Sequence, residues 1–256
     1  MSVSVVVPLY ARRAVGELVR QQPSRAQVFQ RFGIDYCCRG DRPLDEACRK
    51  ARVDLETVCL DLDSCGEDPA SERGDACHEP SLTELLDDMI DRDHAYLNDE
   101  LPQLDASIAR LLSRDRHRYP ELEELSRIFE VLDFEICAHM IKAEQVLFPM
   151  IRRLECDEAH QRSAQSEPGD LVEDVAAVMQ RESNGIEMVL RRMRWLTRGY
   201  EAPAGAGEAY CRLMARLAHL EQELHRHLHL ENNVLFPAAI QSEAQQLTLI
   251  GEEVFV

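Results

Sequence analysis

Two stretches of the chain repeat one pattern, in which a histidine lies ten residues before the proline of a Val-Leu-Phe-Pro segment. The first repeat places His139 before residues 146–149, and the second places His227 before residues 234–237. Both histidines fall on stripes of apolar residues that recur at helical spacing. A histidine buried in such a stripe is costly unless a partner or a metal holds it. The repeat therefore predicts two similar helices that share a metal-binding core.

Four long segments with apolar stripes follow residue 80, and none of them alternates as a β-strand would. The first begins at Ser81, where Ser81 and Glu84 have the spacing of a capping box. Four such helices predict an all-α fold, an up-down four-helix bundle, preceded by a small helical N-terminal module. The expected domains are the module at residues 1–64, a linker at 65–80 and the bundle at 81–245.

The formal net charge of −18 limits the partners of this protein. Such an acidic chain repels nucleic acid and anionic membranes, so we expect it to bind no nucleic acid and no membrane. Its apolar runs are shorter than the roughly 20 residues that cross a bilayer. Nine cysteines without CxxC spacing favour reduced thiols, and the N-terminus does not resemble a signal peptide. These features predict a soluble, cytoplasmic protein.

The spacing of His227 and Glu231 carries the metal-binding argument. Residues four apart differ by about 40° around a helix, so these two side chains share one face. Bundles that bind two metals use such pairs on facing helices. His94, on the apolar stripe of the first bundle helix, joins His139 and His227 as a third candidate. The residues alone leave two interpretations open, a metal site or buried histidines with protein partners.

Adjacent cysteines, Cys37 and Cys38, follow a helix stop in the stretch Gly-Ile-Asp-Tyr-Cys-Cys-Arg-Gly at residues 33–40. On a turn they could form a redox pair, a mixed-disulfide site or soft metal ligands. They could equally be two small side chains that pack a tight corner. The sequence does not choose between these roles.

This stretch resembles the N-terminal module of the ScdA/YtfE-type iron-sulfur cluster repair proteins, also called RIC proteins, which carries a D-[FY]-C-C-x-G motif. Arg39 stands where that family usually has glycine. The later segments HMIKAEQVLFP and HRHLHLENNVLFP resemble signatures of the hemerythrin-like domain in the same family. The resemblance covers nearly the whole chain and implies a hemerythrin-like bundle.

The resemblance also implies a di-iron centre with four histidines and two bridging glutamates. Two of those ligands are missing here, because the second-helix glutamate falls on Ala143 and the third-helix histidine on Ser183. The chain is therefore expected to hold two irons, as the family does, or only one. Carried over by position, the ligands that remain are His94, His139, His227 and Glu231.

Nearby carboxylates are candidates to complete the second half of the site. Glu144 lies about 140° from His139 around an ideal helix, so it reaches inward only where the helix is bulged. Glu182 and Glu187 flank the Ser183 position, and either could also supply a ligand. Glu135 and Glu223, one turn before the two repeated histidines, are expected to support those histidines or to line a channel.

By resemblance, the protein is expected to help restore iron-sulfur clusters damaged by nitric oxide or oxidative stress. Damaged iron-sulfur proteins would then be its partners, with Cys37 and Cys38 serving redox chemistry or iron transfer. Two alternatives remain open, a hemerythrin-like sensor or store of oxygen, nitric oxide or iron, and a metal-free bundle that acts as an interaction protein. No catalytic residue is assigned, iron handling is favoured over an enzymatic reaction, and a homodimer is a possible assembly.

Overall fold

The computed structural model describes residues 10–65, 80–160 and 171–253 of the chain. Over these ranges the structure is helical, and its one extended pairing is an isolated bridge between Ala14 and Pro43. The all-α fold expected from the sequence is confirmed. No helix among the described residues is long and apolar enough to cross a membrane.

Contacts divide the described residues into two compact units. The first holds the residues up to 65 together with Leu228–Pro237, and the second holds Pro80–His227 and the residues from Ala238 onward. The segment Leu228–Pro237 is the middle of the last long helix. The domain boundaries expected from the sequence stay a prediction, since most of the expected linker lies outside the described residues.

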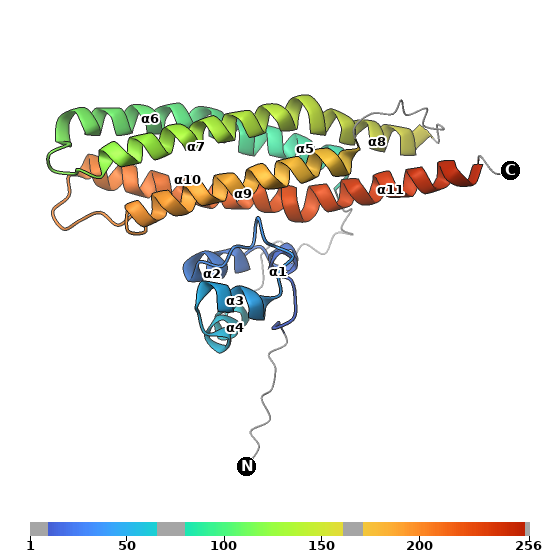
Figure 1. Cartoon of the computed structure of the whole chain (residues 1–256), viewed down its shortest axis with the longest axis horizontal. Helices are drawn as coiled ribbons and strands as arrows, with labels where there is room; N and C mark the ends of the chain where they lie inside the picture. Colours follow the sequence, from blue (N-terminus) through green and yellow to red (C-terminus); the bar gives the residue numbers. More distant parts are fainter. Residues whose placement is uncertain (1–9, 66–79, 161–170, 254–256) are drawn as a thin grey trace, which may run out of the picture. The chain divides into compact units, whose positions relative to one another are not determined.

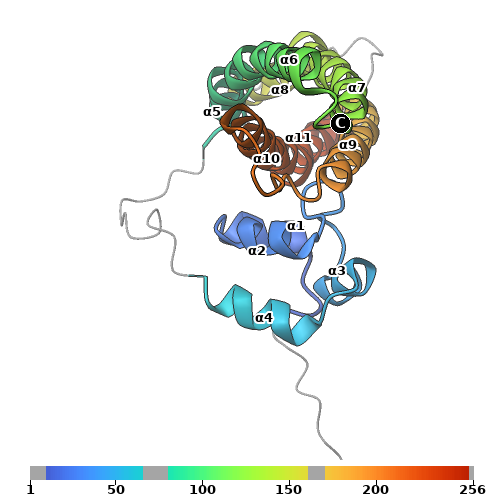
Figure 2. The ribbon, with the colours of Figure 1, turned by 90° about the vertical axis from the view of Figure 1, so that its left-hand side faces the viewer.

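Four long helices build the bundle, and Figures 1 and 2 show them side by side and end on. Each of three helices contains one π-helical turn, in which backbone hydrogen bonds span five residues instead of four. The first helix comprises α5 (Leu82–Asp88), η1 (Met89–His94) and α6 (Ala95–Asp115). The second comprises α7 (Leu122–Lys142), η2 (Ala143–Leu147) and α8 (Phe148–His160). The third is α9 (Val172–Leu196), and the fourth comprises α10 (Glu208–Leu230), η3 (Glu231–Leu235) and α11 (Phe236–Glu253).

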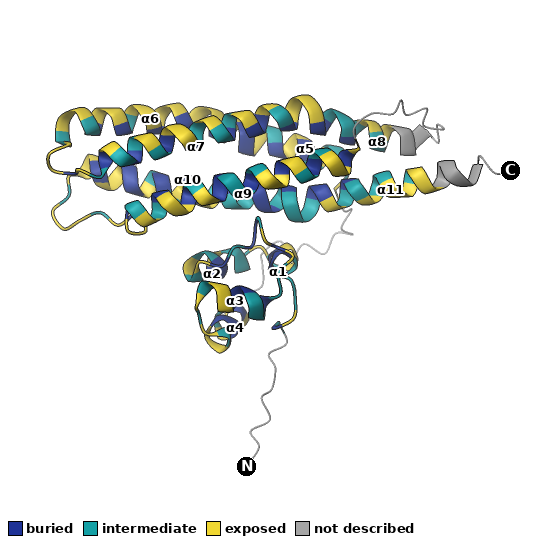
Figure 3. Cartoon of the chain, in the orientation of Figure 1, coloured by how far each residue is buried: buried dark blue, intermediate teal, exposed yellow. Residues whose placement is uncertain are grey.

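The apolar stripes of these helices face inward and form the core, shown in dark blue in Figure 3. Each buried leucine contributes roughly 1.5–3 kcal/mol by leaving water. On α6 the buried residues are Leu97, Leu101, Leu104, Ile108 and Leu111. On α9 they include Met179, Ile186, Leu190 and Met193.

The sequence repeat extends to the helix caps. Ser81 and Glu84 form the predicted capping box at α5, and Glu155 of α8 accepts hydrogen bonds from the Leu82 and Thr83 amides at 2.6 and 2.9 Å. In the second repeat, Glu243 of α11 caps α9 in the same way. Its carboxylate accepts from the amides of Val172 and Glu173 at 2.8 and 3.4 Å. Glu243 lies as far after Glu155 as His227 lies after His139.

The first unit contains four short helices, α1 (Val15–Gln21), α2 (Arg25–Phe32), α3 (Leu44–Ala51) and α4 (Leu55–Asp63). Gly33 ends α2 with φ 65°, a left-handed conformation that glycine adopts without the steric cost of a Cβ. The chain then turns directly into the cysteine pair. Apolar side chains such as Leu18, Phe29 and Leu44 close the core of this unit.

Candidate metal centre

The histidines expected from the sequence are buried in the bundle. His94, His139 and His227 are 1, 2 and 2% exposed, and the Glu231 side chain one turn after His227 is fully buried. One ligand atom from each of His94, His227 and Glu231 lies within 4.8 Å of the other two. The chain therefore brings two imidazoles and a carboxylate to one point, a set of donors typical of a transition-metal site.

His139 lies beside this group but outside the 4.8 Å set. Its ring centroid is 6.1 Å from that of His227, and the two planes are nearly perpendicular. His94 is closer to His227, with a centroid distance of 5.2 Å. The three imidazoles thus converge from three segments, η1, α7 and α10.

Glu144 reaches His94 because of the π turn. Its Oε1 atom lies 2.6 Å from Nδ1 of His94, although the Glu144 side chain is 42% exposed. In an α-helix Glu144 would point away from the face of His139. The π turn that begins at Ala143 stacks residues five apart, which brings Glu144 to that face.

A carboxylate also contacts Nδ1 of His227, and it belongs to Asp93. Its Oδ2 atom lies 3.3 Å from Nδ1 of His227, and its Oδ1 atom accepts a 2.5 Å hydrogen bond from Arg226. Burial alone would raise the pKa of Asp93, but the hydrogen bonds from His227 and Arg226 outweigh it and lower the pKa. Asp93 is therefore a carboxylate that favours the Nδ1–H tautomer of His227 and leaves Nε2 to face a metal.

Glu182 approaches the third histidine. Its Oε2 atom is 3.8 Å from Nδ1 of His139, an ion-pair distance too long for a hydrogen bond. Lys142 pairs with the other oxygen of Glu182. Contacts with His139 and Lys142 lower the pKa of Glu182, so the carboxylate stays charged.

Two positions of the expected site carry neither a histidine nor a carboxylate. Ala143 is fully buried and carries no ligand atom. Ser183 is also fully buried, and its hydroxyl donates a 3.0 Å hydrogen bond to the Met179 carbonyl of its own helix. Glu144 and Glu182, proposed from the sequence as substitute ligands, contact Nδ1 atoms of histidines instead of filling these two positions.

The two glutamates expected to support the histidines, Glu135 and Glu223, differ in the contacts that the structure shows for them. Glu223 pairs with Arg226 at 2.8 Å, and Arg226 in turn donates a hydrogen bond to Asp93, the carboxylate that contacts His227. Glu135 is half-buried and lies one turn before His139 on α7, so its role beside that histidine stays a prediction. The sequence analysis did not identify Asp93 as a partner of His227. Asp93 is adjacent to His94, and adjacent residues point about 100° apart on an α-helix. The sequence also does not show that η1 is a π turn.

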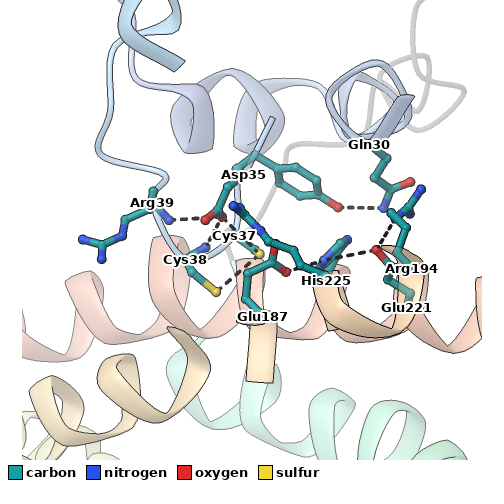
Figure 4. Close-up of polar contacts among 11 residues, drawn as sticks. Gln30, Asp35, Cys37, Cys38, Arg39, Glu187, Arg194, Glu221 and His225 are labelled. Carbon is teal, nitrogen blue, oxygen red and sulfur yellow. Dashed lines mark hydrogen bonds and ion pairs between the residues drawn. The ribbon is translucent and has the colours of Figure 1, made fainter. Parts of the chain in front are cut away.

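The cysteine pair forms a tight turn in the first unit, drawn in Figure 4. Oδ1 of Asp35 accepts hydrogen bonds from the amides of Cys38 and Arg39 at 2.9 and 3.3 Å, and from the Cys37 thiol at 3.6 Å. The two sulfur atoms are 3.5 Å apart. Cys37 is buried and Cys38 is half-buried, so the turn presents two unequal thiols.

Figure 4 also draws a buried charge cluster of the bundle. Nε2 of His225 lies 2.7 Å from Glu187, and burial, which would raise the Glu187 pKa, is outweighed by His225 and Arg191. Glu221 is likewise buried and accepts a 2.8 Å hydrogen bond from Arg194. Because each carboxylate pairs with a guanidinium, this cluster balances its own charge and is a poorer cation site than the histidine group.

Comparison with known proteins assigns both parts of the chain. Residues 85–239, more than half of it, match the family model described as "Hemerythrin HHE cation binding domain". Residues 11–65 match the model ScdA_N, described as "Domain of Unknown function (DUF542)". The resemblance inferred from the sequence is thereby confirmed.

Curated relatives match along nearly their whole length. "Iron-sulfur cluster repair protein YtfE" of Yersinia pseudotuberculosis serotype O:1b (strain IP 31758) is 30% identical over 239 residues, which cover 91% of this chain and 99% of that protein. The protein of the same name from Escherichia coli O157:H7 is 29% identical over 236 residues, with the same two coverages. "Iron-sulfur cluster repair protein ScdA" of Staphylococcus haemolyticus (strain JCSC1435) is 27% identical over 226 residues, covering 87% of this chain and 95% of its own.

Replacing Asp93 by asparagine tests how much the buried carboxylate supports His227. The amide keeps the shape but loses the charge that favours the Nδ1–H tautomer, so the affinity for Fe²⁺ should fall about 10- to 100-fold. Competition with a chromophoric chelator under anaerobic conditions measures this change. Asp99→Asn, at an exposed position on α6, is the matched control and should leave the affinity unchanged. Equal Fe²⁺ affinities in the two variants would show that Asp93 does not support the metal centre.

Proposed function

The chain belongs to the hemerythrin HHE cation binding family and is similar along most of its length to iron-sulfur cluster repair proteins; on that premise we propose that it binds iron and helps restore damaged iron-sulfur clusters. The observation that carries the proposal is the buried meeting point of His94, His227 and Glu231. Burying these polar groups together costs free energy that a bound cation recovers.

We assign the chain one iron, held by Glu231 and the Nε2 atoms of the histidines. Three imidazoles and a carboxylate suit a single Fe²⁺, although zinc would also fit by ligand type. A second ion would need donors where Ala143 and Ser183 stand. The ammonium group of Lys142, paired with Glu182 beside His139, already supplies a positive charge near that half of the site.

Metal analysis of anaerobically purified protein tests this stoichiometry. We expect one iron per chain, and we expect His227→Ala to lose most of it because the variant lacks the imidazole between His94 and His139. His117→Ala, which removes an exposed histidine, should keep the full content. Two irons per chain would show that other residues complete a second position. A metal-free wild-type chain would instead favour a bundle that acts only as an interaction protein.

Repair requires that iron or electrons pass between the protein and a damaged client, and the turn at Cys37 and Cys38 is the proposed participant. A pair of thiols 3.5 Å apart beside a carboxylate can bind a soft metal ion or undergo oxidation. Nitric oxide and oxidants are the proposed sources of damage. We place the activity in the cytosol, because none of the described cysteines is in a disulfide and reducing compartments maintain thiols.

Incubation with an iron-sulfur enzyme inactivated by nitric oxide tests the repair function. The iron-loaded wild-type protein should restore most of the enzyme activity, and Cys37→Ser/Cys38→Ser should restore at most about a tenth as much. Cys156→Ser/Cys211→Ser, which changes two exposed cysteines, is the control and should repair normally. Iron-loaded protein that binds oxygen or nitric oxide reversibly but restores nothing would identify a sensor or a store.

An apolar face on α7 and α9 supports a homodimer. Its largest exposed side chains are Phe134 and Ile141 on α7 and Met188 and Trp195 on α9, between 55 and 71% exposed. A groove between these helices is lined by residues that include Ile128, Val131, Gly185 and Val189. Exposed apolar patches of this kind typically mark association surfaces.

The charges beside this face favour a second copy of the chain as the occupant. Exposed Glu123 and Glu130 lie on α7, whereas exposed Arg181 and Arg191 lie on α9. A two-fold axis parallel to the helices would place α7 of one copy over α9 of the other, so acidic side chains of α7 would meet arginines of α9 twice.

Sedimentation at micromolar concentrations tests the dimer. We expect the wild-type chain to sediment as a dimer and Phe134→Glu/Met188→Glu as a monomer, because the variant buries two charges in the contact. Leu60→Glu, at an exposed leucine of α4, should remain dimeric. A monomeric wild-type protein, or a dimeric double variant, would rule out this face.

A further inference from the structure

The side chain of Asn233, on η3, forms hydrogen bonds to the turn that carries Cys37 and Cys38. Its Nδ2 atom donates hydrogen bonds to the backbone carbonyls of Cys37 at 2.9 Å and Tyr36 at 3.3 Å. All these residues belong to the first compact unit. The same amide group lies 3.2 Å from Nδ1 of His229, one turn earlier on the helix. One amide group therefore contacts the two peptide carbonyls that position the thiols.

Two glycines make this close approach feasible. A Cβ added at Gly40 would lie 2.6 Å from Cγ of Asn233, and one added at Gly16 would lie 2.8 Å from the same atom. Real Cβ atoms do not tolerate such distances. The Gly16 amide also donates a 2.8 Å hydrogen bond to the Gly40 carbonyl, so the two glycines are joined around the amide. The Asn233 side chain thus occupies a fitted slot.

Asn233 lies two residues after Glu231 within the same π turn. A π turn is an irregular element, and a small change in its hydrogen bonding moves the residues it contains together. A cation held by Glu231 would fix this turn. The hydrogen bonds of Asn233 would then pass that constraint to the backbone at Cys37, whose side chain is only 2% exposed.

We propose that Asn233 couples iron binding at Glu231 to the accessibility of the Cys37 and Cys38 thiols. The inference rests on the proposed metal centre and adds regulation to it. Asn233 is a positioning residue, because it contacts the backbone of the turn and neither thiol. With iron bound the turn is held closed, and without iron the turn opens more often. By linkage, opening the turn weakens iron binding by the same factor.

Peptide-resolved alkylation measures the accessibility directly. Trypsin cleaves after Arg31 and Arg39, and the peptide 32–39 contains Cys37 and Cys38 as its only cysteines. The full-length wild-type chain is treated with iodoacetamide under anaerobic conditions, with and without Fe²⁺, and the bound iron is measured in the same samples. We expect Fe²⁺ to slow alkylation of this peptide about fivefold or more.

Asn233→Ala should abolish the effect of Fe²⁺ while the chain still binds iron, because alanine removes the hydrogen bonds but no proposed ligand. Its alkylation rate without iron should rise about tenfold, as expected for two lost hydrogen bonds. Gly40→Ala adds a Cβ that would displace the Asn233 side chain, so this variant should behave like Asn233→Ala. Gly207→Ala is the control, since an added Cβ there meets nothing within 4 Å.

An Asn233→Ala chain with the wild-type rate, or with an undiminished response to Fe²⁺, would overturn the proposal. So would an iron-loaded wild-type chain whose thiols react at the same rate as those of the iron-free chain. If the wild-type chain bound no iron, the result would contradict the proposed metal centre. The rates without iron would then still decide whether Asn233 holds the turn.

Discussion

The contact between Asp93 and His227 is the interaction on which the centre of the bundle depends. An imidazole buried to 2% exposure needs a partner for its N–H, and a buried carboxylate needs hydrogen bonds for its charge. Each satisfies the other at 3.3 Å, and Arg226 takes the second oxygen of Asp93. His94 meets Glu144 in the same manner. Carboxylates therefore meet the Nδ1 atoms of two of the histidines around the site.

The π turns make this arrangement compatible with long helices. A regular α-helix cannot place both a histidine and the residue five positions later on one face. η2 does so for His139 and Glu144, and η3 begins at the equivalent place in the second repeat, at Glu231. The repeat thus preserves a backbone irregularity as well as a histidine. Its two copies differ in the side chain that the irregular turn presents, alanine in one and glutamate in the other.

Much of the site followed from residue spacing, and the exceptions have a common cause. The capping box at Ser81 and the shared face of His227 and Glu231 depend on residues three or four apart, where helical geometry is reliable. Asp93 and Asn233 act on residues far away in the chain. Helical periodicity says nothing of such pairs, because it fixes the direction of a side chain and not its partner on another segment.

The sequence by itself determined the all-α class, the bundle, the family and the burial of His94, His139 and His227, since all four depend on local periodicity or on motifs. Only the tertiary structure decided which carboxylate serves which histidine. Glu144, considered as an iron ligand, contacts Nδ1 of His94, and Asp93 rather than Glu223 contacts His227. The physical reason is that the reach of a carboxylate depends on the π turns and on the packing of neighbouring helices.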